Sequence, residues 1–130
     1  MLRKTKEFTA AARKRLTVSA LCAAALLVAQ TAFAHVFPSK QEPASGATVS
    51  APAQVRITFN GPLEPAFSTL TVTDAAGKPV TTSKASIDAK APDVISVPLS
   101  ELAAGQYTVH WVAVASDGHR THGDYTFDVK

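Results

Sequence analysis

The residues of this 130-residue sequence that are most able to do chemistry are four histidines: His35, His110, His119 and His122. Imidazole nitrogens bind transition metals such as Cu(II) and Zn(II), and a carboxylate, Asp117, stands two residues before His119. On an extended backbone this spacing would project both side chains to the same side, and Gly118 between them would allow a sharp bend. Asp117 and His119 are therefore candidate metal ligands, and a plain turn is the other interpretation, because Ser-Asp-Gly is also common turn chemistry.

His35 acquires a second nitrogen ligand if the chain is cleaved just before it. Residues 1–15 carry six Lys and Arg, residues 16–29 are apolar, and Ala32-Phe33-Ala34 is an A-x-A cleavage signal. Together these features predict a secretory signal peptide over residues 1–34, and the apolar run is shorter than the ~20 residues that span a bilayer. Cleavage would make His35 the first residue, whose α-amine and imidazole can chelate one ion. Cu(II) suits such a site because it favours tetragonal coordination by nitrogen and oxygen.

The other two histidines are weaker candidates. His110 alternates with Val109 and Trp111 in an apolar segment, so we expect it to face solvent on a strand and not to bind metal. His122 stands three residues after His119 in a segment that resembles a turn. It could share a metal with His119 or be an exposed loop residue, and the sequence alone leaves both interpretations open.

The net charge and the sulfur content of the chain argue against two further kinds of binding site. The net charge of +3 falls to −2 from residue 35 onward, because six of the 13 Lys and Arg but only one of the 10 Asp and Glu precede it. The basic balance belongs to the predicted signal and does not indicate nucleic-acid binding. Cys22 and Met1, the single cysteine and methionine, also precede residue 35. Without sulfur, the mature chain should lack a sulfur-based Cu(I) site and hold one Cu(II).

Alternating apolar residues predict the strands that must position these side chains. Period-2 patterns recur in five segments, at residues 54–59, 69–73, 94–99, 107–112 and 124–129. Turn residues separate them, as in Asn60-Gly61-Pro62. About seven short strands at this spacing predict an all-β, two-sheet antiparallel sandwich over residues 35–130. Tyr107 stands where a tyrosine corner would place it, at the start of a strand.

Several segments resemble the CopC family of periplasmic copper-binding proteins, and the match extends over essentially the whole predicted mature chain. They are Ala34-His35, the runs Pro43-Ala-Ser-Gly46, Pro52-Ala-Gln-Val-Arg-Ile-Thr-Phe59 and Leu102-Ala-Ala-Gly-Gln-Tyr-Thr-Val-His-Trp111, then Ser116-Asp-Gly-His119 and Gly123-Asp-Tyr-Thr-Phe-Asp-Val129. The N-terminal histidine combined with Trp…Ser-Asp-x-His is the specific part of this pattern.

The resemblance implies a seven-stranded Greek-key sandwich, related to cupredoxin and immunoglobulin-like folds, and a Cu(II) site formed by His35, Asp117 and His119. It also implies a role in copper resistance, homeostasis or delivery, with a CopD-type inner-membrane protein as a possible partner. Some members have a methionine-rich Cu(I) loop, for which this chain has no residues, and some place a glutamate near the site where Gly61 stands here. We do not transfer that role to the nearby Glu64.

A copper-dependent redox enzyme of the lytic polysaccharide monooxygenase type is the alternative, because such enzymes use a similar N-terminal histidine. The mature chain is short for such an enzyme and has few aromatic residues for a flat sugar-binding face. An aspartate ligand also differs from the open axial position that oxygen activation requires. We therefore expect a binding protein and not an enzyme.

Overall fold

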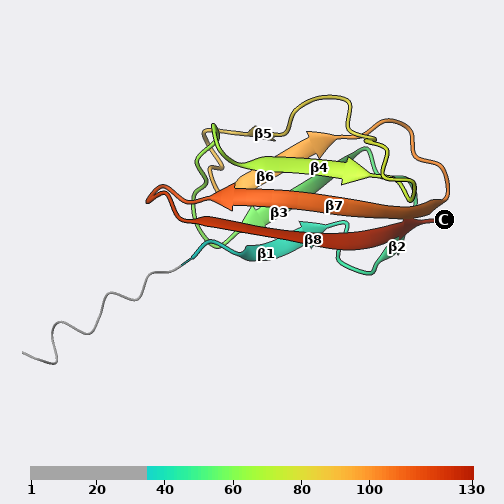
Figure 1. The fold of residues 1–130 in the computed structure, drawn as a ribbon, viewed down its shortest axis with the longest axis horizontal. Helices are drawn as coiled ribbons and strands as arrows, with labels where there is room; N and C mark the ends of the chain where they lie inside the picture. Colours follow the sequence, from blue (N-terminus) through green and yellow to red (C-terminus); the bar gives the residue numbers. More distant parts are fainter. Residues whose placement is uncertain (1–34) are drawn as a thin grey trace, which may run out of the picture. The chain divides into compact units, whose positions relative to one another are not determined.

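The computed structural model describes residues 35–130, which form two four-stranded sheets packed face to face (Figure 1). One sheet has the order β1-β3-β6-β5 and the other β2-β8-β7-β4. The strands are β1 (Pro38–Glu42), β2 (Thr48–Val49), β3 (Gln54–Phe59), β4 (Thr69–Thr73), β5 (Ser86–Ile87), β6 (Val94–Pro98), β7 (Gly105–Val114) and β8 (Arg120–Val129). Within this part of the chain no helix is long and apolar enough to cross a membrane. The predictions for residues 1–34 lie outside the described residues.

The all-β prediction is confirmed, and the alternating segments became the strands β3, β4, β6, β7 and β8. The expected count of seven strands differs from the eight that residues 35–130 form. Strands β2 and β5 have two residues each, too few to show a period. Strand β1 has no alternating apolar face, because it is an edge strand whose side chains are exposed or half-buried.

The expectation of a purely antiparallel sandwich is also corrected at one edge. Strand β2 pairs in parallel with β8, with Thr48 opposite Asp128 and Val49 opposite Val129. The turn at Pro43–Gly46 carries the chain from the first sheet to the second, and Gly46 N donates to Thr126 O at 2.8 Å. The chain therefore reaches the edge of β8 running in the same direction as that strand.

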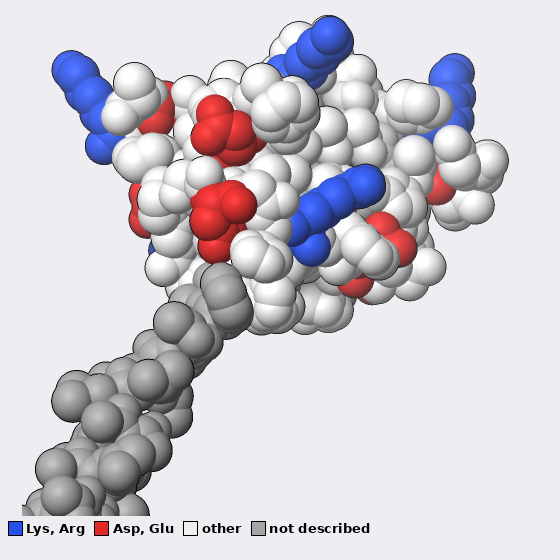
Figure 2. Space-filling model, turned by 60° about the vertical axis from the view of Figure 1, so that its left-hand side comes forward, with Lys and Arg blue, Asp and Glu red and all other residues white. Residues whose placement is uncertain are grey.

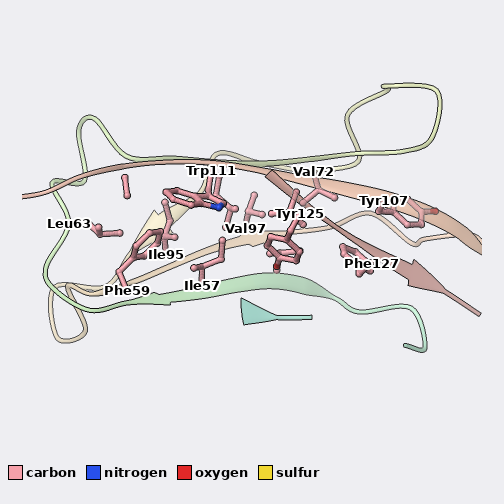
Figure 3. Close-up of a cluster of buried hydrophobic side chains, with 14 of the residues drawn as sticks. Ile57, Phe59, Leu63, Val72, Ile95, Val97, Tyr107, Trp111, Tyr125 and Phe127 are labelled. Carbon is pink, nitrogen blue, oxygen red and sulfur yellow. The ribbon is translucent and has the colours of Figure 1, made fainter. Parts of the chain in front are cut away.

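Aliphatic and aromatic side chains together fill the space between the sheets (Figure 3). Near one end Trp111 meets Phe59 edge to face, with ring centroids 5.4 Å apart. Near the other, Tyr107 stacks on Phe127 and donates its hydroxyl to Ala103 O at 2.7 Å, which confirms the predicted tyrosine corner. Burial raises the pKa of Tyr125 to about 12, so its hydroxyl stays protonated and is no phenolate ligand at neutral pH.

Gly123 leaves the space that Trp111 fills. The two residues are directly opposite in the β7–β8 ladder, and a Cβ on Gly123 would lie 2.6 Å from Trp111 Cζ2. Because the indole is only 8% exposed, it has little room to move away. We expect Gly123→Ala to lower the free energy of unfolding by about 1–3 kcal/mol, measured by chemical denaturation. Thr126→Ala, on the outward face of the same strand, is the control, and equal losses for both would contradict this packing argument.

Candidate metal centre

The turn between β7 and β8 presents two of the predicted ligands. Ala115 N donates to His119 O and Gly118 N donates to Ala115 O, both at 2.9 Å, which closes the turn. Gly118 has φ of +87°, a conformation that glycine adopts without steric cost. A bridge between Leu63 and Ala115 fixes the base of the turn against the loop that follows β3.

Asp117 and His119 are in contact, but not for the reason that the sequence suggested. Strand β7 ends at Val114, so the two residues do not share one side of an extended strand. The turn brings them together instead. Asp117 Oδ1 accepts from His119 N at 3.0 Å, and Asp117 Oδ2 lies 3.0 Å from His119 Nδ1. The predicted proximity therefore holds, while its predicted cause was wrong.

These contacts keep the carboxylate charged and orient the imidazole. The hydrogen bond from His119 N, followed by the one from the His119 side chain, holds the pKa of Asp117 below its usual value. Both side chains are near half exposed, Asp117 at 50% and His119 at 43%, so an ion can reach them from solvent. The pair thus presents a carboxylate oxygen and an imidazole nitrogen 3.0 Å apart, both of them donor types that bind Cu(II).

His35 lies beside this turn, although it is 84 residues from His119 in sequence. The two imidazole rings have centroids 5.3 Å apart and an interplanar angle of 82°. Figure 1 shows that the described chain begins at the same end of the sandwich as the β7–β8 turn. The next residue, Val36, is buried, and its carbonyl accepts from Thr121 Oγ1 at 2.7 Å. The start of β8 thus holds the chain one residue after His35.

The structure places His110 on another surface. Its ring is 42% exposed on the outer face of β7, with Nδ1 2.7 Å from Asp124 Oδ1 and Nε2 3.1 Å from Thr73 Oγ1. The neighbours Val109 and Trp111 point into the core. The prediction that His110 faces away from the core is confirmed, and its two contacts occupy both ring nitrogens.

His122 and Glu64 lie on elements other than the β7–β8 turn that carries His119. The expectation of a turn at His122 is corrected, because this exposed residue lies within β8, opposite Val112. Glu64 is half-buried, and its backbone N donates to Val114 O at 2.7 Å, next to the turn. A Cβ at Gly61 would lie 3.3 Å from Val36 Cγ1, so this position packs against the residue after His35.

Asn60 is the residue at this end that sequence reasoning missed. The sequence around Asn60 indicates only a turn, yet its side chain accepts from Phe37 N at 2.8 Å and donates to His35 O at 3.4 Å. No periodicity or motif links residue 60 to residues 35–37, because the contact depends on how β1 and β3 are paired. The only sequence signal was an amide side chain at the end of a strand.

The donor atoms at this site suit Cu(II), but within residues 35–130 they do not already enclose a position for the ion. Among residues 35–130 no three His, Cys, Asp or Glu side chains already surround one point. The site consists of the imidazoles of His35 and His119 and of the Asp117 carboxylate, which is in contact with His119. Nitrogen and hard oxygen donors without sulfur fit Cu(II) better than Cu(I). In the 130-residue chain the backbone nitrogen of His35 is part of a peptide bond. It would become an α-amine only after cleavage before His35.

Basic and acidic side chains are mixed on one face of the domain. On the face drawn in Figure 2 the Lys and Arg side chains stand apart from one another and are interspersed with Asp and Glu. A nucleic-acid footprint needs basic residues gathered in a patch or a stripe.

Comparisons with known proteins agree on one family. A CopC domain model matches residues 39–130. Copper resistance protein C of Xanthomonas campestris pv. juglandis is 33% identical over 123 residues, which are 90% of this chain and 97% of that protein. CopC from Methylosinus trichosporium OB3b has a TM-score of 0.69 at 35% identity, covering 74% of this chain and 94% of the other. PcoC, a methionine-rich copper resistance protein from Escherichia coli, has a TM-score of 0.67 at 33% identity, covering 75% and 100%. This chain belongs to the CopC family.

Proposed function

We propose that this protein binds one Cu(II) per chain outside the cytoplasm and serves copper resistance, homeostasis or delivery. The ligands are His35, through its α-amine and imidazole, together with Asp117 and His119. The observation that carries the proposal is the meeting of two imidazoles, with centroids 5.3 Å apart, beside a carboxylate at one end of the sandwich. The copper resistance relatives support the choice of metal.

In this proposal copper is cargo, and the residues explain why it can be both held and released. Two imidazoles, an amine and a carboxylate satisfy the preference of Cu(II) for tetragonal nitrogen and oxygen coordination. Because the ligand side chains are exposed, an acceptor protein can approach the ion directly. An inner-membrane copper transporter of the CopD type is the acceptor or donor that we propose, with the periplasm as the location and residues 1–34 as the signal that directs secretion.

Intact mass measurement of the secreted protein tests processing and stoichiometry together. We expect the purified chain to begin His-Val-Phe-Pro and its native mass to rise by one copper when Cu(II) is added. A competition with a Cu(I)-specific indicator under anaerobic conditions should show no tight Cu(I) site, because residues 35–130 contain no sulfur. A start at any other residue would contradict the amine ligand, and two tightly held Cu(II) ions would contradict the stoichiometry.

A further inference from the structure

The backbone before β1 is held by one residue, Asn60, which directly follows β3. The pairing of β1 with β3 ends at Pro38 opposite Phe59, and Pro38 has no N–H with which to extend the ladder. Beyond this point Asn60 takes over. Its backbone N donates to Phe37 O at 3.0 Å, and its Oδ1 accepts from Phe37 N at 2.8 Å. One residue therefore satisfies both backbone groups of Phe37.

The same side chain reaches the residue that we propose as the metal chelate. Asn60 Nδ2 donates to His35 O at 3.4 Å, which is a long hydrogen bond. The 2.8 Å bond from Phe37 N to Asn60 Oδ1 is therefore the stronger of the two. On the other side of the segment, Thr121 Oγ1 holds Val36 O. Residues 35–37 are thus fixed from β8 and from the end of β3, in two different sheets.

We propose that Asn60 is a positioning residue for copper capture by His35. It turns the His35 carbonyl toward β3, so that this oxygen does not compete with the α-amine as the second donor of the residue. It also fixes the direction in which His35 leaves the sandwich, which keeps its imidazole beside His119. Binding then costs less ordering of the chain end, since a preorganised site loses less freedom when it binds. This inference rests on the proposed function.

The test compares three variants of the mature protein that begins at His35. In Asn60→Ala both side-chain bonds are lost, and in Asn60→Asp the acceptor for Phe37 N remains while the donor to His35 O is lost. Ser39→Ala is the matched control, because Ser39 Oγ also bridges β1 to β3, by donating to Thr58 O at 3.1 Å, but farther from the site. Cu(II) affinity is measured by chelator competition, the coordination by electron paramagnetic resonance, and Phe37 amide exchange in the metal-free protein.

We expect Asn60→Ala to weaken Cu(II) binding about 10–100-fold, the usual effect of losing a partner that orients a metal ligand. Its resonance spectrum should show more than one copper species, and its Phe37 amide should exchange faster. Asn60→Asp should keep the Phe37 amide protected and show a smaller loss of affinity, while Ser39→Ala should change neither affinity nor spectrum.

Wild-type affinity and spectrum in Asn60→Ala would overturn the positioning role, whatever the exchange rate. If Asn60→Ala does not fold, Asn60→Asp decides, because it keeps the stronger bond and the shape of the side chain. In that case a wild-type affinity together with a wild-type resonance spectrum overturns the proposal, because the added carboxylate charge can offset a loss of affinity but not a change of coordination. Failure of the proposed function is recognised separately, since the wild-type protein itself would then lack a Cu(II) site that depends on His35.

Discussion

His119→Ala is expected to weaken Cu(II) binding more than about 100-fold, a larger effect than the ~10–100-fold typical of residues that only orient a ligand. The substitution removes one of the two imidazoles at the end of the sandwich and the contact of Asp117 Oδ2 with Nδ1, while the bond from the backbone N of residue 119 to Asp117 Oδ1 remains. Neither Asp117 nor His35 can supply the missing nitrogen. Competition against a chelator of known affinity, at fixed pH and with the mature chain, gives the ratio of the dissociation constants.

Two further variants show whether this loss of Cu(II) affinity is specific to His119. Asp117→Asn should weaken binding less, because water can replace one oxygen ligand in part. His110→Ala is the matched histidine control and should leave affinity unchanged, since His110 contacts Asp124 and Thr73 on the outer face of β7. A large loss from His110→Ala, or none from His119→Ala, would show that copper is held elsewhere.

The sequence predicted the central strands because their burial follows a simple period. In β3, Val55, Ile57 and Phe59 are buried while their neighbours are exposed or half-buried, and that is the pattern the sequence displays. Strand β2 gave no such signal, since its two residues pair in parallel with β8 only after the chain has crossed between the sheets. Local patterns therefore predicted the core and missed the edges.

The sequence indicated the candidate ligands more fully than it indicated how the fold brings them together. Asp117 and His119 stand out by residue type and spacing, but the turn that joins them follows from where β7 ends. The placement of His35 beside His119 depends on contacts across both sheets, such as Thr121 with Val36 and Asn60 with Phe37. Such contacts leave no local pattern, and residues 84 positions apart were linked by their ligand chemistry and by the resemblance to a family, not by any spacing.

Adding a single alanine before His35 is expected to weaken Cu(II) binding at least as strongly as the loss of His119, about 100-fold or more. The extension converts the α-amine into an amide and leaves the imidazole, Asp117 and His119 unchanged. It should also flatten the dependence of affinity on pH. Nitrogen ligands must release protons before they bind a metal, so the native chain should lose affinity steeply from neutral pH to about pH 5. The extended chain has one such proton fewer to release.

The measurement is Cu(II) affinity against pH for the native start and for the alanine-extended chain. The extension should leave the fold intact, because the first buried anchor is Val36 and not His35. Equal melting temperatures of the two metal-free proteins are therefore the control. Asp117 should add little to the slope in either protein, because the hydrogen bond from His119 N holds the pKa of its carboxyl below the usual value. Equal affinities of the two proteins at every pH would exclude the α-amine as a ligand, and copper would then have to be held by side chains alone.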